Sequence, residues 1–314
     1  MELIPYNSSL KEEWNSTVEM SKNGTFLFNR SFMEYHSDRF ENCSLMFFDK
    51  KRCIACLPAN IDRAGQAVYS HQGLTYGGFV MLPRVTGGQL LEMFSSASDY
   101  FRSELKAHSL FYKPVPHIYC RYPSEEDLYA LFRSGGKLAA RGLSSAIPLS
   151  SRIPFTESRK GGIRKAKASG LRVVCVNDVE AYWHLLDETL TTCHSVHPVH
   201  TASELKLLME RFPDNIKLYN VFAPDDRLLG GCLLFVDRRV VHVQYIAANA
   251  EGKSCGALDL LFNHIISEAG FKQEYLDFGV STEKGGTVLN EGLLFQKEGF
   301  GGRGVAYDTY AVEL

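Results

Sequence analysis

The sequence predicts an α/β protein with mixed sheets, built as two tandem lobes of similar design. Its 314 residues suggest about two domains, and helical and strand-like segments alternate along the chain. One order of elements also occurs twice, over residues 44–150 and 216–314. In both stretches a hairpin leads to a third strand, a helix, a strand, a short helix and final strands. Residue identity between them is slight, so the repeat is one of element order. We place the lobes at residues 1–150 and 151–314.

Strand alternation and helical spacing define the elements of the first half. Residues 44–48 and 53–57 predict a hairpin around the polar turn 49–52. Residues 87–105 carry apolar side chains at helical spacing, which predicts a helix. We expect the remaining elements to be a helical segment near residues 10–14, a third strand from Val68 into the glycine-rich loop 71–78, an irregular or edge strand at 109–120, a short helix at 124–132 and an extended segment at 138–149.

A linker and a basic helix that ends near Gly170 open the second half, and residues 151–172 contain seven Arg or Lys side chains. Asp178 and Thr201 have the character of helix N-caps. We expect helices at 178–193, 201–212, 254–269 and 290–297, and strands at 171–176, 216–223, 228–236, 240–248, 275–279 and 304–312.

Composition excludes several classes of protein. Hydrophobic residues make up 45% of the chain and charged residues 22%, which is typical of a globular protein and not of a disordered chain or a disulfide scaffold. The formal charge of −2 argues against a DNA-binding protein. No stretch approaches 18 apolar residues, so we expect no membrane span. The N-terminus lacks the pattern of a secretory signal, and we expect a cytoplasmic protein.

The eight cysteines are dispersed, and most lie in apolar runs. Cys53 and Cys56 have C-x-x-C spacing, but no second ligand pair follows that would complete a zinc site. The pair does not open a helix as in a thioredoxin-like unit either. We therefore interpret both residues as buried, reduced side chains of a strand.

Four segments combine with the order of elements to suggest a family. They are residues 158–170 (SRKGGIRKAKASG), 71–78 (HQGLTYGG), 277–279 (DFG) and 295–301 (FQKEGFG). With these segments, the chain resembles the double-GNAT acyltransferases, a group that includes Fem-type peptidoglycan peptidyltransferases and related bacterial N-acyltransferases. The resemblance implies an enzyme that joins an acyl or aminoacyl group to an amine. The donor is acyl-coenzyme A in GNAT enzymes proper and aminoacyl-tRNA in Fem-type enzymes.

The resemblance places a donor phosphate at the turn before the helix that starts near Ser254. The glycines allow close backbone approach, and a helix N-terminus offers free N–H groups. The family's loop usually ends in a small residue, whereas Leu258 stands there in this chain. The candidate phosphate-binding residues are Gly252, Lys253, Ser254 and Gly256, with Arg164 from the basic helix. The alternatives are a plain strand–helix connection for the turn and a solvated face for the basic helix.

The resemblance also implies catalytic positions. Tyr245 and Ile246 stand where a GNAT strand offers backbone N–H groups to the donor carbonyl, which stabilises an oxyanion. Asp277 and Glu283 flank the end of the neighbouring strand, where a carboxylate accepts a proton from the attacking ammonium. Asp277 is equally compatible with a buried carboxylate that holds a loop.

Histidine and tyrosine side chains of two loops are further candidates. His71 and Tyr76 lie in the glycine-rich loop and are expected near the substrate, His71 in a catalytic role. A tight turn that needs glycine is the alternative reading of that loop. His194, His197 and His200 cluster between two helices, and we expect His197 to border the acceptor. No matching Cys or carboxylate pattern accompanies them, so we expect no metal.

The sequence thus favours an N-acyltransferase that moves an acyl group from acyl-coenzyme A to a small amine acceptor by direct attack. Two alternatives stay open: an aminoacyl-tRNA-dependent peptidyltransferase of the Fem type, and a non-catalytic ligand-binding protein of the same fold. We expect the candidates from the two halves to line one pocket.

Overall fold

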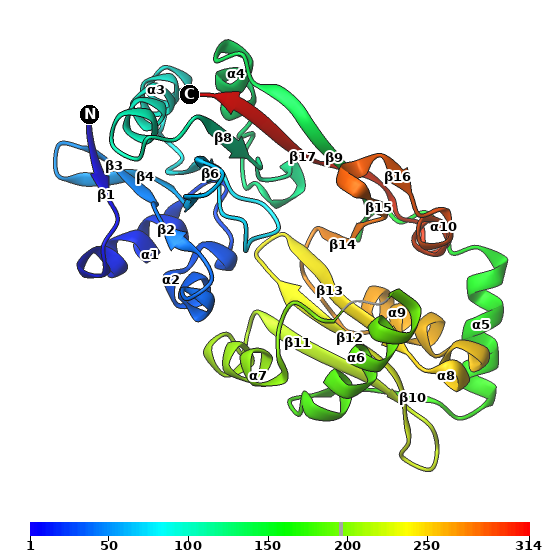
Figure 1. The fold of residues 1–314 in the computed structure, drawn as a ribbon. Coiled ribbons are helices and arrows are strands. Elements are labelled where there is room, and N and C mark those ends of the chain that lie inside the picture. The colour runs from blue at the N-terminus through cyan, green and yellow to red at the C-terminus, as the bar shows by residue number, and fades with distance from the viewer. Residues whose placement is uncertain (195–196) are drawn as a thin grey trace. The chain divides into compact units, whose positions relative to one another are not determined.

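The computed structural model describes residues 1–194 and 197–314, except for the side chains of residues 193 and 194. The chain divides into two compact units, whose elements are labelled in Figure 1. The first unit consists of Met1–Leu143, Thr282–Val288 and Ala306–Leu314, and the second of Ser144–Ser281 and Leu289–Val305. Each unit therefore takes segments from both halves of the sequence, whereas we expected a single boundary after residue 150.

The first unit holds four α-helices and most of the short strands in the described part of the chain. The helices are α1 (Lys11–Met20), α2 (Arg30–Met33), α3 (Gly87–Ser103) and α4 (Glu126–Arg133). The strands are β1 (Glu2–Pro5), β2 (Glu41–Asn42), β3 (Leu45–Asp49), β4 (Arg52–Leu57), β5 (Asn60–Asp62), β6 (Ala67–Tyr69), β7 (Val80–Met81) and β8 (Ser109–Tyr112). Three further strands, β9 (Lys137–Pro148), β16 (Val288–Leu289) and β17 (Arg303–Glu313), have residues in both units, and β15 (Thr282–Glu283) pairs with β16.

Two groups of strands surround the core of the first unit. One has the order β1-β3-β4-β7, and the other has the order β17-β8-β6-β5-β2. The hairpin β3–β4 is the one predicted, and α3 matches the predicted amphipathic helix closely. A capping box starts α3: the Thr86 side chain accepts from the Gln89 backbone N–H, and the Gln89 side chain accepts from the Thr86 backbone N–H.

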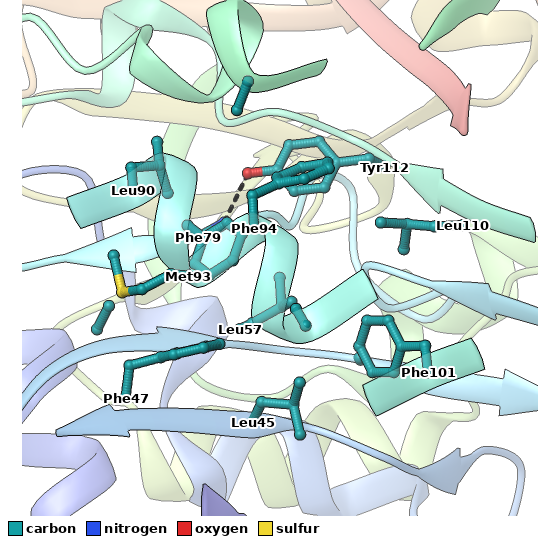
Figure 2. Packing of buried hydrophobic residues seen from close by; sticks show 14 of the residues in the cluster. Leu45, Phe47, Leu57, Phe79, Leu90, Met93, Phe94, Phe101, Leu110 and Tyr112 are labelled. Carbon is teal, nitrogen blue, oxygen red and sulfur yellow. Dashed lines mark hydrogen bonds between the residues drawn. The ribbon is translucent and has the colours of Figure 1, made fainter. Parts of the chain in front are cut away.

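The core of the first unit lies between α3 and these strands (Figure 2). Phe79, Phe94 and Tyr112 pack there with ring centroids 5.9–6.4 Å apart. The Tyr112 hydroxyl accepts from the Phe79 backbone N–H at 2.8 Å and donates to the buried Asp127 carboxylate at 2.8 Å. The phenol therefore places a satisfied polar group inside an apolar cluster.

The second unit contains six helices and five strands of its own among the described residues. The helices are α5 (Glu157–Ala168), α6 (Glu180–His194), α7 (Ala202–Arg211), α8 (Ala250–Cys255), α9 (Ala257–Ser267) and α10 (Glu291–Gly299). The strands are β10 (Arg172–Val176), β11 (Ile216–Phe222), β12 (Leu228–Val236), β13 (Val240–Ala248) and β14 (Tyr275–Val280). With part of β9 they follow the order β10-β11-β12-β13-β14-β9.

The repeated order of elements appears in both units as one topological motif. In the first unit, β6 continues through β7 and α3 to β8, and β6 and β8 are parallel. In the second, β13 continues through α8 and α9 to β14, and these strands are also parallel. A long strand pairs antiparallel with each motif: β17, which follows the first motif in the chain, pairs with β8, and β9, which precedes the second, pairs with β14. The predicted fold of two tandem α/β units with mixed sheets is confirmed.

Helix α9 provides most of the helical contribution to the second core. Leu261, Phe262 and Ile265 pack against strand residues such as Val241 and Leu276. The predicted helix 254–269 differs from the structure in two respects: α8 already begins at Ala250, and Gly256 adopts a left-handed conformation with φ of 81° that separates α8 from α9. No helix in the described residues is both long and apolar enough to cross a membrane.

Candidate functional site

The end of the parallel pairing between β13 and β14 creates the polar centre of the second unit. Three residue pairs form this register, and the last of them is His242 opposite Asp277. Beyond it β13 continues to Ala248 without a partner residue on β14. Its pairing with β12 also shifts there, which leaves Gln244 as a bulged residue. The β13 backbone beyond His242 therefore has one side that β14 does not cover.

Asp277 is the most enclosed charged group of this centre. Its side chain has 0% exposure. One carboxylate oxygen accepts from the Ser144 hydroxyl and from the Gly279 backbone N–H, and the other lies 2.8 Å from His242 Nδ1. A carboxylate so buried and so fully bonded cannot reach a substrate amine. The geometry therefore favours an orienting role for Asp277 over the direct proton acceptor that we expected.

His242 is the partner of Asp277 and the more exposed residue of the pair. Its side chain is 12% exposed, whereas Asp277 is completely buried. When Nδ1–H donates to a carboxylate, the neutral imidazole keeps Nε2 as its basic nitrogen. The carboxylate also stabilises the imidazolium that forms when Nε2 takes a proton. His242 thus has the arrangement of a general base, a role that we did not predict for it.

Lys297 supplies a positive charge beside the same strand. It is 6% exposed, and its ammonium donates to the carbonyls of Gly279 and Val280, both at 2.8 Å. Burial lowers the pKa of Lys297 to about 8, and the Asp277 charge partly opposes this effect. An ammonium has three N–H donors, and two of them hold the bend of β14 in place.

The predicted phosphate turn has a different conformation from the one expected. Gly252, Lys253 and Ser254 lie inside α8, and the Asn249 side chain already accepts from the Gly252 N–H at 2.8 Å. A Cβ on Gly252 would lie 2.2 Å from the Leu229 carbonyl oxygen, and one on Gly256 would lie 2.4 Å from the Gly162 carbonyl oxygen. Both glycines therefore have an evident packing role.

Several basic side chains of helix α5 form ion pairs or hydrogen bonds with other residues of the second unit. Arg159 pairs with Asp259 of α9 at 2.7 Å, and both side chains are largely buried. Lys160 pairs with Glu157, and Lys165 donates to the Ser254 carbonyl. Arg164 is exposed and forms no ion pair with the other described residues. It is therefore the side chain of this helix best placed to meet an anionic ligand.

The remaining candidates of the second unit lie on β13 and in the loop before α7. The Tyr245 hydroxyl lies 2.6 Å from His200 Nδ1, and burial raises the pKa of this tyrosine. Ile246 is half-buried on the part of β13 beyond its pairing with β14. His197 is exposed and lies 2.8 Å from Asp187. The side chain of His194 lies outside the described residues.

His71, Tyr76 and Glu283 belong to the first unit. His71 adopts a left-handed backbone with φ of 70°, and burial lowers its pKa to about 3, so its ring stays neutral. The Tyr76 hydroxyl donates to Thr25 Oγ1 at 3.3 Å, and its ring packs against Phe28. Glu283 is exposed on β15. The described residues contain no group of three or more His, Cys, Asp or Glu that is placed to hold a metal ion.

A family model for the acetyltransferase (GNAT) domain matches residues 157–284. This range contains both His242 and Asp277. Residues 157–284 form a GNAT domain. The match makes the chain an acyltransferase, as the resemblance implied. No curated protein matches the sequence significantly.

Solved structures match this chain along its whole length. The crystal structure of FemX is 12% identical, with a TM-score of 0.71 over 100% of this chain and 98% of that chain. The C-terminal domain of a lysylphosphatidylglycerol synthetase from Agrobacterium fabrum is 13% identical, with a TM-score of 0.62 over 98% and 92%. A tandem GNAT protein from the clavulanic acid biosynthesis pathway is 10% identical, with a TM-score of 0.54 over 99% and 98%. At these identities the likeness establishes the tandem GNAT fold.

Sequence reasoning missed three residues of this centre. Lys297 lies inside the segment 295–301 that supported the resemblance, but the motif alone assigned it no partner. His242 alternates with apolar residues on its strand, which indicated only a polar face. Ser144 gave no signal at all, because it meets Asp277 across 133 positions of sequence.

Proposed function

We propose that this GNAT protein is an N-acyltransferase in which His242, oriented by Asp277, accepts the proton of the attacking amine. The donor in this proposal is acyl-coenzyme A, and the acceptor is a small amine. The contact between His242 Nδ1 and the buried Asp277 carboxylate carries the proposal. Because Asp277 would hold the proton on Nδ1, Nε2 is the ring nitrogen that acts as the base in this proposal.

The reaction in this proposal needs no covalent enzyme intermediate. The acceptor ammonium gives a proton to His242 Nε2, and the free amine nitrogen attacks the thioester carbonyl carbon. The carbon–nitrogen bond forms, and the negative charge moves to the carbonyl oxygen. When the carbonyl re-forms, the carbon–sulfur bond breaks, and the leaving thiolate takes up the second proton, which the attacking nitrogen loses as it becomes the amide nitrogen. The products are an amide and free coenzyme A.

Two groups would stabilise the oxyanion. Tyr245 and Ile246 of β13 lie beyond the pairing with β14, so backbone N–H groups there that do not bond to β12 can donate to a ligand. The Lys297 ammonium adds a positive charge near Asp277. Donors that are already fixed before the substrate arrives cost no reorganisation during the reaction.

An aminoacyl-tRNA donor is the second candidate. The likeness to FemX favours it, as does α8, where Asn249 occupies the Gly252 N–H that a pyrophosphate would need. Both donors present an activated carbonyl to an amine, so the roles of His242 and Asp277 are the same in each. They differ in what leaves: a thiol from coenzyme A, or the ribose hydroxyl of tRNA.

Parallel assays with the full chain distinguish the donors. One arm follows thiol release from acetyl-coenzyme A and longer acyl-coenzyme A esters with a panel of amines. The other follows loss of label from a mixed pool of aminoacyl-tRNA with the same amines. Amine-dependent thiol release supports the first donor, and amine-dependent deacylation of tRNA supports the second. If neither donor is consumed and neither raises the thermal midpoint, the acyltransferase proposal is wrong.

A further inference from the structure

Cys53 and Cys56 lie on β4 of the first unit, outside the candidate acyltransferase site. Their sulfur atoms are 4.0 Å apart, and the residues are 2% and 0% exposed. In a regular strand, residues three apart point to opposite faces, and their Cα atoms are about 10 Å apart. Two such side chains do not meet, so the sulfur contact requires an irregularity in the strand.

A β-bulge supplies this irregularity. In the pairing of β3 with β4, Phe48 stands opposite Cys53 and Phe47 opposite Ala55, so Ile54 is an extra residue. Cys56 stands opposite Met46. Three steps on β4 therefore cover the length of two steps on β3, which is about 6.7 Å.

This separation decides what the two thiols can do. Disulfides join Cα atoms that are about 4.4–6.8 Å apart, so the bulge brings this pair within the upper end of the range. It also turns both side chains to one face of the strand. A bond formed near the limit of the range is strained and is therefore readily reduced.

The two thiols differ chemically. A hydrogen bond from Cys56 lowers the pKa of Cys53, against the effect of burial, and Thr17 of α1 adds a second hydrogen bond. Burial raises the pKa of Cys56 well above its usual value. Because the thiolate is the nucleophile, Cys53 is the thiol that reacts first and Cys56 the one that follows.

We propose that Cys53 and Cys56 are a modification site that forms a reversible intramolecular disulfide, with a hydroperoxide as the oxidant. The Cys53 thiolate attacks one peroxide oxygen, the O–O bond breaks, and the hydroxide that leaves takes up the proton lost by the Cys53 thiol and becomes the first water. The Cys56 sulfur then attacks the resulting sulfenic sulfur, the S–S bond forms, and a second water is released. Two thiols and one hydrogen peroxide thus give one disulfide and two waters, and a dithiol reverses the oxidation.

Helix α1 controls access to the pair. Glu13 accepts from the Cys53 backbone N–H at 3.3 Å, and Thr17 lies against the Cys53 sulfur. A small oxidant therefore reaches Cys53 when α1 moves away, and we expect oxidation to be slower than that of an exposed thiol.

Mass spectrometry of the full chain tests the proposal. The reduced protein is incubated with hydrogen peroxide, unfolded, alkylated and digested. We expect a peptide in which Cys53 and Cys56 are joined, with both alkylation sites lost and both regained after dithiothreitol. In the Cys53→Ser and Cys56→Ser variants no joined peptide should form, so the remaining cysteine of the pair should not lose its alkylation site to a disulfide. Cys232→Ser is the matched control, because Cys232 is also fully buried and donates to a carbonyl rather than contacting a sulfur.

Peptide mapping of the wild-type chain decides the question even if a variant fails to fold. The proposal is overturned if Cys53 gains only oxygen atoms, if both thiols stay alkylatable, or if Cys53 pairs with another cysteine. It is also overturned if the joined peptide appears only when oxidant is added after unfolding.

Discussion

The Asp277 carboxylate lies 2.8 Å from His242 Nδ1, and these residues are also the last pair in the parallel register of β13 and β14. The strand pairing therefore fixes the same two side chains whose hydrogen bond determines which imidazole nitrogen is basic. Ser144 and the Gly279 backbone bind the other carboxylate oxygen, so Asp277 cannot rotate without breaking two further hydrogen bonds.

Replacing the orienting carboxylate should slow the reaction and leave donor binding intact. Asp277→Asn keeps the size of the side chain but removes the negative charge and loosens control of the His242 tautomer. We expect kcat to fall by about 10²–10⁴-fold, the range typical of general-base catalysis, with the donor dissociation constant little changed. Asp308→Asn is the matched control: it makes the same substitution at a carboxylate that pairs with Arg141 in the first unit, outside the candidate site. Equal losses in the two variants would contradict this role for Asp277.

The charge on Lys297 should appear in the alkaline limb of the pH–rate profile. Because its pKa is lowered to about 8, the ammonium loses its proton as the pH rises through this value. We expect activity to decline above about pH 8 in the wild type and to persist to higher pH in Lys297→Arg, since arginine stays charged. Lys297→Met should be slow at every pH. An unchanged alkaline limb in Lys297→Arg would show that another group titrates there.

Close glycine packing between α5 and α9 should control the stability of the second unit. A Cβ on Gly162 would lie 1.8 Å from an Asp259 oxygen, so Gly162→Ala should displace the carboxylate that pairs with Arg159. We expect a loss of about 1–3 kcal/mol, measured as a lower thermal midpoint. Gly161→Ala is the matched control, because the nearest atom to its Cβ would be 4.0 Å away. A midpoint lowered equally by both changes would indicate a general effect of alanine on α5.

Asp127 should make the stability of the first unit depend on pH. Burial raises its pKa from 3.8 to about 6, so the folded state disfavours the charged carboxylate. Its contribution to stability is complete below about pH 4 and is lost as the pH rises through about 6. Asp127→Asn should flatten the unfolding free energy across this window, as measured by denaturant titration at several pH values. If Asp127→Asn keeps the pH dependence of the wild type, another titratable group causes it and the role given to Asp127 is wrong.

Local signals in the sequence predicted much of the fold but little of the polar centre. The capping box of Thr201 and Glu204 starts α7 where we expected a helix, because a cap depends on residues only three positions apart. Asp277 was likewise found from its motif. Its partners Ser144 and His242 come from two other strands, so only the strand register reveals them.

The predicted phosphate turn at residues 252–256 was misinterpreted from its composition. Its glycines suggested an open turn, but Gly252 and Gly256 are needed because the Leu229 and Gly162 carbonyls leave no room for a Cβ. A local sequence motif does not predict packing between elements that are distant in the sequence. The same reason explains why the two units differ from a single boundary after residue 150. Strands β9 and β17 each have residues in both units, and the order of the sequence alone does not predict this.

Single-turnover acyl transfer by four proteins tests the central claim most directly: the wild type, His242→Gln, Asp277→Asn and the double variant. Each is mixed in excess with the donor that supports turnover and a saturating amine. If His242 and Asp277 act as one unit, each single change slows transfer by at least about 100-fold, and the double variant is no slower than the slower single variant. Transfer by His242→Gln at the wild-type rate, or losses that multiply in the double variant, would contradict the account.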